Sequence, residues 1–168
     1  MSNAALKAAP SESNGMTGLE RSDRKDQAET LSKVLSDSAV LYIKTLGVHW
    51  NIVGPLFYSV HKLTEEQYQD MAEAIDTIAE RIRALGFTAP GSMQEFLQFS
   101  DIVDSEQKQS GEEMIQGLIG GNEMCAKSLR EAALQADEAG DVKTADLLTE
   151  RIGQHEENAW MLRAMLSA

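Results

Sequence analysis

At 168 residues, the chain has the length of one domain that can bury a substantial core. Its 27 acidic and 15 basic residues give a formal net charge of −12, which disfavours direct contact with nucleic-acid phosphates. No apolar run approaches the roughly 20 residues of a membrane span and no stretch has the pattern of a signal peptide, so we expect a cytoplasmic protein without a membrane span.

Residues 1–25 differ in composition from the rest of the chain. They are rich in Ser, Ala, Asn and Gly, include Pro10 and show no apolar periodicity, which is typical of a mobile tail. The folded domain is therefore expected at residues 26–168.

The chain as a whole has the composition of an all-α protein, with only three prolines and 5% aromatic residues. Apolar positions three and four residues apart indicate long helices, and Gly86 is suited to cap the second of them. The single cysteine, Cys125, excludes an intramolecular disulfide framework, and we interpret it as a small core hydrophobe. The expected helices span about 27–53, 56–85, 93–99, 105–139 and 141–166.

The connections between these helices predict the topology. A short turn, a long crossover at residues 87–104 and a second short turn at Gly140 produce an up-down-down-up bundle, which is the ferritin-like connectivity. The expected fold is therefore an all-α, ferritin-like four-helix bundle with a short helix in the long crossover between helices 2 and 3.

Two histidines flank the first break in the helical pattern. His49 and His61 stand on either side of residues 51–56, and Pro55 lies midway between them. If the flanking helices form an antiparallel hairpin, both histidines lie at a similar distance from the turn and converge.

Beyond the turn, His61 and Glu65 form one i,i+4 pair on a helix face, and Asp76 and Glu80 form another. The two pairs lie on nearly the same stripe but are roughly 16 Å apart along the helix, too far to share one metal ion. An antiparallel copy of the helix, related by a two-fold axis near residues 70–71, would place His61 and Glu65 of one chain opposite Asp76 and Glu80 of the other. Two equivalent sites would then form between the subunits.

The side chains in this pattern are imidazoles and carboxylates without a thiolate. Such a ligand set suits iron, zinc or manganese rather than a soft metal. The alternative interpretation of the same spacing is an amphipathic helix with solvated acidic residues and an incidental histidine.

The residues around these positions resemble the Dps family of mini-ferritins. The resemblance runs from about Leu31 to Leu166 and rests on a two-part motif together with its internal spacing. It implies four-helix bundles that assemble into hollow dodecamers built from two-fold dimers, with a ferroxidase site at the dimer interface. The segments that carry it are His49-Trp50-Asn51 followed by His61, Asp76-Thr77-Ile78-Ala79-Glu80-Arg81 followed by Leu85-Gly86, and Trp160-Met161-Leu162.

The resemblance also implies an activity: oxidation of Fe(II), preferentially by hydrogen peroxide, with storage of the ferric product and protection against oxidative stress. His49, His61 and Glu65 of one chain and Asp76 and Glu80 of its two-fold partner would bind two iron ions at each site. Glu65 departs from the pattern, because the family often has Asp at this position. Trp50, next to a proposed ligand, would intercept stray oxidising equivalents or would simply be a packing residue.

An ordinary ferritin-like di-iron protein is the nearest alternative enzyme. Such proteins bind iron within each bundle through Glu-x-x-His pairs, and no such pair occurs in this chain. His155, which is followed by Glu156 and Glu157 on the last helix, is interpreted as a surface residue outside the site.

The alternative from a different class is a DNA-condensing nucleoid protein with little ferroxidase activity. Family members that bind DNA directly often use a basic terminus, whereas residues 1–25 carry four basic and three acidic residues, a net charge of +1. We therefore do not expect direct DNA binding at neutral pH.

Acidic residues also surround the turn between the last two helices. By resemblance, this turn lies near a three-fold pore, where carboxylates would attract Fe(II); the alternative is a solvated acidic turn. The residues are Asp137, Glu138, Asp141 and Asp146.

Overall fold

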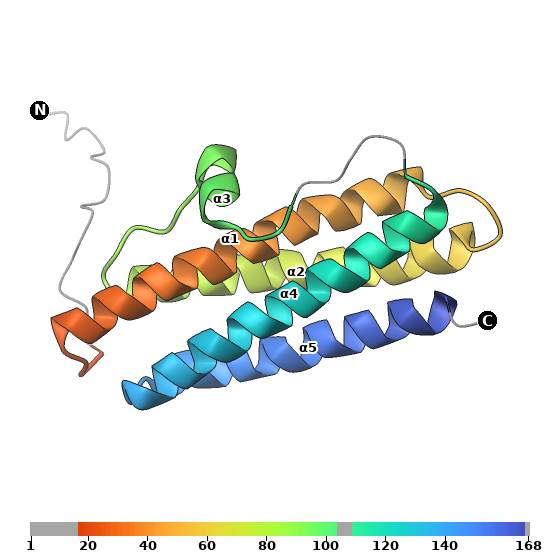
Figure 1. Ribbon diagram of the computed structural model, residues 1–168. Helices are drawn as coiled ribbons and strands as arrows, with labels where there is room; N and C mark the ends of the chain where they lie inside the picture. Colours follow the sequence, from red (N-terminus) through yellow and green to blue (C-terminus); the bar gives the residue numbers. More distant parts are fainter. Residues whose placement is uncertain (1–16, 104–108, 167–168) are drawn as a thin grey trace, which may run out of the picture.

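The computed structural model describes residues 17–103 and 109–166. The regular elements of this part of the chain are all helices (Figure 1). None of them is long and apolar enough to cross a membrane. They are α1 (Arg21–Asn51), α2 (Phe57–Ala84), α3 (Met93–Phe99), α4 (Gly111–Glu138) and α5 (Val142–Leu166).

The four long helices form one bundle, with α3 lying across the outside of α1 (Figure 1). α1 and α5 run in one direction, and α2 and α4 run in the other. The up-down-down-up topology and the short helix in the crossover are therefore confirmed.

The first helix begins at Arg21, six residues before the predicted start at Gln27. Polar contacts hold these first turns, which explains why apolar periodicity did not reveal them. An Arg24 guanidinium nitrogen donates to the Leu85 carbonyl at 2.7 Å, and the Gln27 amide donates to the Gln135 carbonyl at 3.1 Å. The predicted mobile tail covers residues 1–25. Residues 21–25 belong to α1, and residues 1–16 lie outside the described part of the chain.

The fourth helix begins at Gly111, later than the predicted residue 105. Its N-cap is Ser110, whose hydroxyl accepts from the Glu113 backbone N–H while the Glu113 carboxylate accepts from the Ser110 N–H. This reciprocal capping box satisfies two donors at the helix start and sets where the helix begins.

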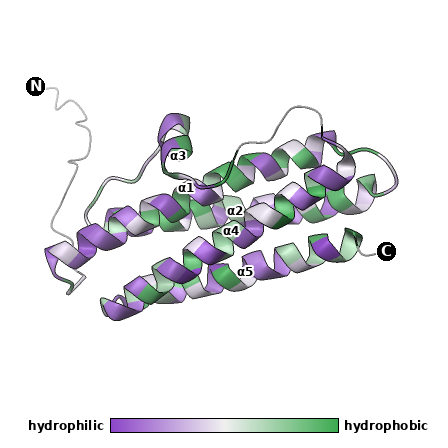
Figure 2. Cartoon of the chain, in the orientation of Figure 1, coloured by the Kyte–Doolittle hydropathy of each residue, from purple (hydrophilic) through white to green (hydrophobic). Residues whose placement is uncertain are grey.

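Apolar side chains from all four long helices meet along the bundle axis, while hydrophilic segments alternate with them along every helix (Figure 2). Cys125 is 1% exposed, and burial raises the pKa of its thiol, so the prediction that it is a small core residue is confirmed. The largest fully buried side chains are Leu31, Leu35, Leu41, Ile52, Met71, Ile78, Ile82, Leu85, Ile115, Leu118, Leu129 and Leu148.

The crossover is anchored to α1 by a buried carboxylate. Asp37 is 1% exposed and accepts hydrogen bonds from the Ser100 hydroxyl at 2.9 Å and the Asp101 backbone N–H at 2.8 Å. The Lys33 ammonium donates to the other Asp37 oxygen at 2.8 Å. These bonds fix the C-terminal end of α3 against the first helix.

Candidate metal centre

The turn between α1 and α2 brings His49 and His61 together. Ile52 is buried at the end of α1, and Gly54 has a φ of 99°, a left-handed conformation that glycine adopts without strain. The Phe57 N–H then donates to the Gly54 carbonyl at 3.0 Å. The two imidazole rings stack with centroids 3.8 Å apart and an interplanar angle of 17°, so the predicted convergence of the histidines is confirmed.

Each histidine is oriented by the backbone of the other. His49 Nδ1 lies 2.9 Å from the His61 carbonyl, and His61 Nδ1 lies 2.9 Å from the His49 carbonyl. The His49 carbonyl belongs to the last turn of α1, where it has no partner within the helix. Because a carbonyl only accepts, each neutral ring carries its proton on Nδ1 and keeps a lone pair on Nε2, the form in which imidazole binds metals.

Aromatic side chains enclose this pair. His49 is buried, whereas His61 is half-buried. The Tyr68 ring meets His49 edge-on with centroids 5.2 Å apart, and the Phe57 ring stacks on His61 at the same centroid distance. Packing of this kind limits rotation of the rings, so the Nε2 atoms are held in place before any metal binds.

Glu65 lies one turn after His61 and is half-buried. The Lys62 ammonium donates to its carboxylate at 2.7 Å. This hydrogen bond, with the positive charge of Lys62, holds the pKa of Glu65 below its usual range. Glu65 is therefore an ionised carboxylate at neutral pH, and a metal ion would have to replace Lys62 as its partner.

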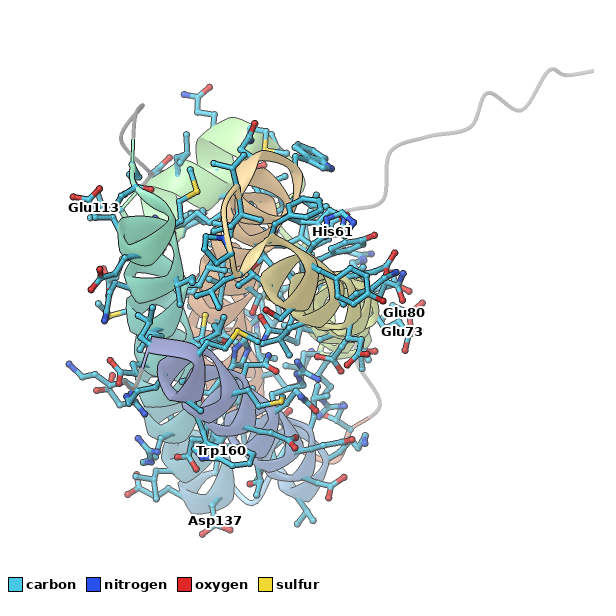
Figure 3. All side chains as sticks on the ribbon, turned by 90° about the vertical axis from the view of Figure 1, so that its right-hand side faces the viewer. His61, Glu73, Glu80, Glu113, Asp137 and Trp160 are labelled. Atoms are coloured by element: carbon cyan, nitrogen blue, oxygen red, sulfur yellow. The ribbon has the colours of Figure 1, made fainter. Side chains whose placement is uncertain are left out.

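Asp76 and Glu80 are exposed further along α2. Figure 3 shows Glu80 and Glu73 on the same flank of the bundle as His61. Within the described residues, a single chain contains no group of three or more His, Cys, Asp or Glu side chains placed to bind a metal. The assignment of Asp76 and Glu80 as ligands that act with a second copy of the chain stays a prediction.

The interpretation of His155 as a surface residue is wrong. The side chain is 1% exposed, and its Nδ1 lies 2.9 Å from the Asn122 amide oxygen of α4. Burial, with a smaller contribution from the nearby positive charge of Arg151, lowers the pKa of His155 to about 4. The spacing contained the signal: His155 lies seven residues after Leu148 and seven before Leu162, and both leucines are buried.

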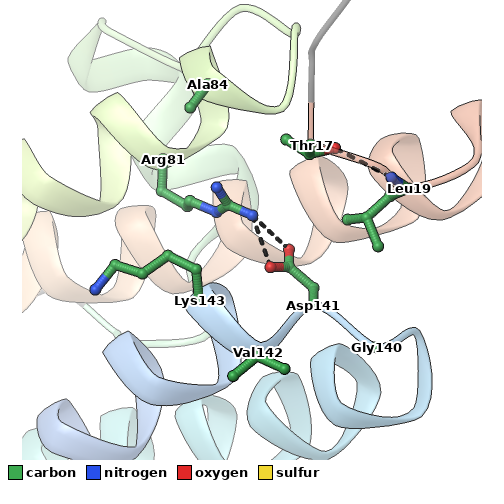
Figure 4. A pocket seen from close by; sticks show the side chains of 8 residues that line it. All are labelled: Thr17, Leu19, Arg81, Ala84, Gly140, Asp141, Val142 and Lys143. Carbon is green, nitrogen blue, oxygen red and sulfur yellow. Dashed lines mark hydrogen bonds and ion pairs between the residues drawn. The ribbon is translucent and has the colours of Figure 1, made fainter.

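Asp141 is a structural residue and is not a solvated part of an acidic turn. It is 4% exposed and accepts two hydrogen bonds from Arg81, at 2.6 and 2.8 Å (Figure 4). Burial by itself would raise the pKa of Asp141, but hydrogen bonds from Arg81 and Thr144 outweigh burial and hold it below its usual value. The pair closes one side of a cavity of about 490 Å³ beside the last turn.

Comparison with known proteins agrees with the fold. Residues 28–168 match the model of the ferritin-like domain family. A low temperature-induced protein of Nostoc sp. is 40% identical over 89% of this chain and 84% of its own. DNA protection during starvation protein 2 of Bacillus anthracis is 36% identical over 85% of this chain and 98% of its own.

Solved structures resemble the whole bundle. The Dps protein from Vibrio cholerae O1, described as a member of a superfamily of ferritin-like diiron-carboxylate proteins, is 33% identical with a TM-score of 0.85. The match covers 92% of this chain and 100% of that one. Dps from Thermosynechococcus elongatus is 28% identical with a TM-score of 0.84, over 88% and 94% of the two chains. From its sequence and its fold, the chain belongs to the Dps family of mini-ferritins.

Proposed function

We propose that the protein oxidises Fe(II) with hydrogen peroxide at sites formed between two copies of the chain, and stores the ferric product inside a hollow shell. The observation that carries this proposal is the reciprocal bonding of His49 and His61, which leaves the Nε2 lone pairs of both rings available, with Glu65 one helical turn after His61. The V. cholerae relative, named as a ferritin-like diiron-carboxylate protein, supports iron as the metal.

The positions on α2 support completion of the site by a second copy. His61 and Glu80 are symmetric about a point between residues 70 and 71, and Glu65 and Asp76 are symmetric about the same point. An antiparallel two-fold partner would therefore place Asp76 opposite Glu65 and Glu80 opposite His61.

The surface at the centre of this face permits close approach. Ala72 lies eleven residues after His61, about three turns along α2, and is exposed. Met71 is buried, and Asp70 accepts two hydrogen bonds from Arg151 of α5, so both residues face into the bundle. A small residue at the centre of the outward face lets two α2 helices pack closely.

Apolar side chains around the α1–α2 turn also support assembly. Trp50, Val53, Phe57 and Tyr58 are exposed in the single chain, next to the two histidines. A concentration of exposed apolar residues marks an interaction surface. We propose that a second copy covers it, in a homododecamer of the kind expected for the family.

The proposed chemistry treats iron as substrate. Neutral imidazole and carboxylate ligands bind Fe(II), and the negative charge of Glu65, Asp76 and Glu80 favours the ferric product. Hydrogen peroxide needs two electrons, and two Fe(II) ions at one site supply them without release of hydroxyl radical. The buried side of His49 excludes water from one face of the site.

The test is an anaerobic Fe(II) titration of the metal-free assembled protein, followed by peroxide and, separately, by oxygen, with ferric absorbance as the readout. We expect rapid oxidation by peroxide, about two Fe(II) consumed per peroxide, and slow oxidation by oxygen. The Asp76→Ala variant should lose tight Fe(II) binding and most of the rate while it keeps its helical circular dichroism spectrum.

Glu73→Ala is the matched control, because it removes one exposed carboxylate that lies three residues before Asp76 on the same helix. If Asp76→Ala oxidised iron at the parental rate, the inter-subunit site would be wrong. If the parent did not accelerate oxidation over buffer, a DNA-associated or scaffolding role would be favoured.

A further inference from the structure

Two of the three tyrosines form a continuous series of ring contacts with the candidate metal centre. The Tyr68 ring on α2 meets His49 edge-on, with centroids 5.2 Å apart and an interplanar angle of 79°. The Tyr42 ring on α1 meets Tyr68 in the same way, with centroids 6.4 Å apart. Because His49 also stacks on His61, the series leads from the metal-binding nitrogens along the seam between α1 and α2.

Such a series is suited to one-electron transfer. A tyrosine phenol is oxidised by one electron when it also loses its proton, and rings in direct contact leave no gap that an electron would have to cross. Both rings are half-buried, so a radical formed there is shielded from most solutes while solvent still reaches the ring edges. Tyr58, the third tyrosine, is 71% exposed in the single chain and does not belong to this series of ring contacts.

An incompletely loaded site needs an additional electron. A single Fe(II) supplies one electron to hydrogen peroxide, and one-electron reduction of peroxide releases hydroxyl radical. On the basis of the function proposed above, we propose that Tyr68 supplies the second electron when its site holds one Fe(II), and that Tyr42 shares the resulting radical.

The step balances in atoms and electrons. The O–O bond of peroxide breaks as it accepts one electron from Fe(II) and one from the Tyr68 phenol. The phenol releases its O–H proton, and this proton, with one proton from solvent, converts the two hydroxide fragments to two water molecules. The products are Fe(III), two waters and a neutral tyrosyl radical, which is then delocalised between Tyr68 and Tyr42 by exchange of one electron and one proton.

The test uses the full-length assembled protein loaded anaerobically with one Fe(II) per site, mixed with hydrogen peroxide and frozen rapidly for electron paramagnetic resonance. We expect an organic radical signal in the parent, and narrowing of its lines when the protein contains ring-deuterated tyrosine. Tyr68→Phe keeps the ring contact with His49 but lacks the oxidisable O–H group. It should lose the signal and release several-fold more hydroxyl radical to a spin trap.

Tyr58→Phe is the matched control and should keep the parental signal. Tyr42→Phe should keep the signal but shorten its lifetime several-fold, because the radical can then occupy only Tyr68. Co(II) titration of each variant checks that the two histidines still bind a metal.

Two results would overturn the relay, that is, electron supply by Tyr68 with the radical shared by Tyr42. One is an unchanged signal in Tyr68→Phe. The other is a signal that ring-deuterated tyrosine does not narrow and that Trp50→Phe removes. A parent that oxidises Fe(II) with peroxide but forms no tyrosyl radical would overturn the relay alone. A parent that does not oxidise Fe(II) at all would overturn the proposed function together with it.

Discussion

The two imidazoles of the candidate centre are oriented before any metal is bound. In each ring, Nδ1 is engaged by a backbone carbonyl of the facing helix, so the ring cannot turn without breaking that hydrogen bond. Glu65, by contrast, is held by the flexible Lys62 side chain. An exposed ion pair of this kind contributes little to stability, so exchange of Lys62 for a metal ion costs little.

His155 makes a prediction about pH at the residue scale. The unfolded chain, in which the histidine has its ordinary pKa near 6.5, gains the proton before the folded chain, in which the pKa is about 4. The stabilisation from the neutral ring is therefore complete above pH 6.5 and is lost as the pH falls from 6.5 to 4. Between pH 7 and pH 5, we expect the parent to lose about 2 kcal/mol of unfolding free energy through this residue.

The measurement is urea denaturation of the parent and of His155→Gln at both pH values and equal subunit concentration. Asp70 and Arg151 lie close enough to His155 to affect its charge, but both are present in the two proteins and cancel in the comparison. If the two proteins lost the same unfolding free energy between pH 7 and pH 5, His155 would not be the buried neutral group described here.

At the scale of the elements, some helix ends are set by the local sequence, whereas the contacts between helices depend on residues far apart in the chain. Gly86, with a φ of 100°, follows the end of α2, so the predicted glycine cap is confirmed. The start of α1 was not predictable from periodicity, because polar residues that contact distant helices hold it. Gly121 of α4 is important for a contact between helices and not for a helix end, since its lack of a side chain matters only where α4 meets α1.

The neighbouring glycines of α4 should respond to alanine in opposite directions. A Cβ atom on Gly121 would lie 2.6 Å from a methyl carbon of Leu41, which is fully buried and has little space to move. Gly121→Ala should therefore destabilise the fold by about 1–3 kcal/mol. A Cβ atom on Gly120 would meet nothing within 4 Å, and Gly120→Ala should stabilise the helix by about 0.4–1 kcal/mol.

Thermal and urea unfolding of the two variants provide the measurement. The outcome that contradicts the packing is a Gly121→Ala variant as stable as Gly120→Ala, because the same backbone change would then have the same effect at both positions.

At the scale of the whole molecule, the candidate centre in one chain is half of the proposed site. One chain presents the histidines and Glu65 near one end of α2, and Asp76 and Glu80 three turns further along. The proposed two-fold partner is therefore a functional requirement and not only a route to a shell. It also explains why exposed apolar residues gather around the α1–α2 turn.

Mixing two inactive variants tests this requirement. His61→Ala and Asp76→Ala should each lose tight Fe(II) binding alone. In a mixed dimer, one site carries both defects and the other carries neither, so co-refolded protein should regain iron oxidation in proportion to the fraction of mixed dimers. Activity that does not return on mixing would place all the ligands in one chain.

The sequence by itself determined the all-α class, the bundle topology and the convergence of His49 with His61. These features depend on local periodicity, on glycine at helix ends and on the distance of each residue from a turn, all of which are properties of neighbouring residues. The metal and the reaction proposed for the protein come from the family resemblance, and membership of the Dps family is confirmed.

Only the tertiary structure decided the burial of His155 and Asp141, the early start of α1 and the contact of Tyr68 with His49 and Tyr42. Each depends on a partner far away in the chain: Asn122 for His155, Arg81 for Asp141, Leu85 for Arg24. A polar residue is buried where a distant group satisfies its hydrogen bonds, and such pairing has no periodicity along the sequence.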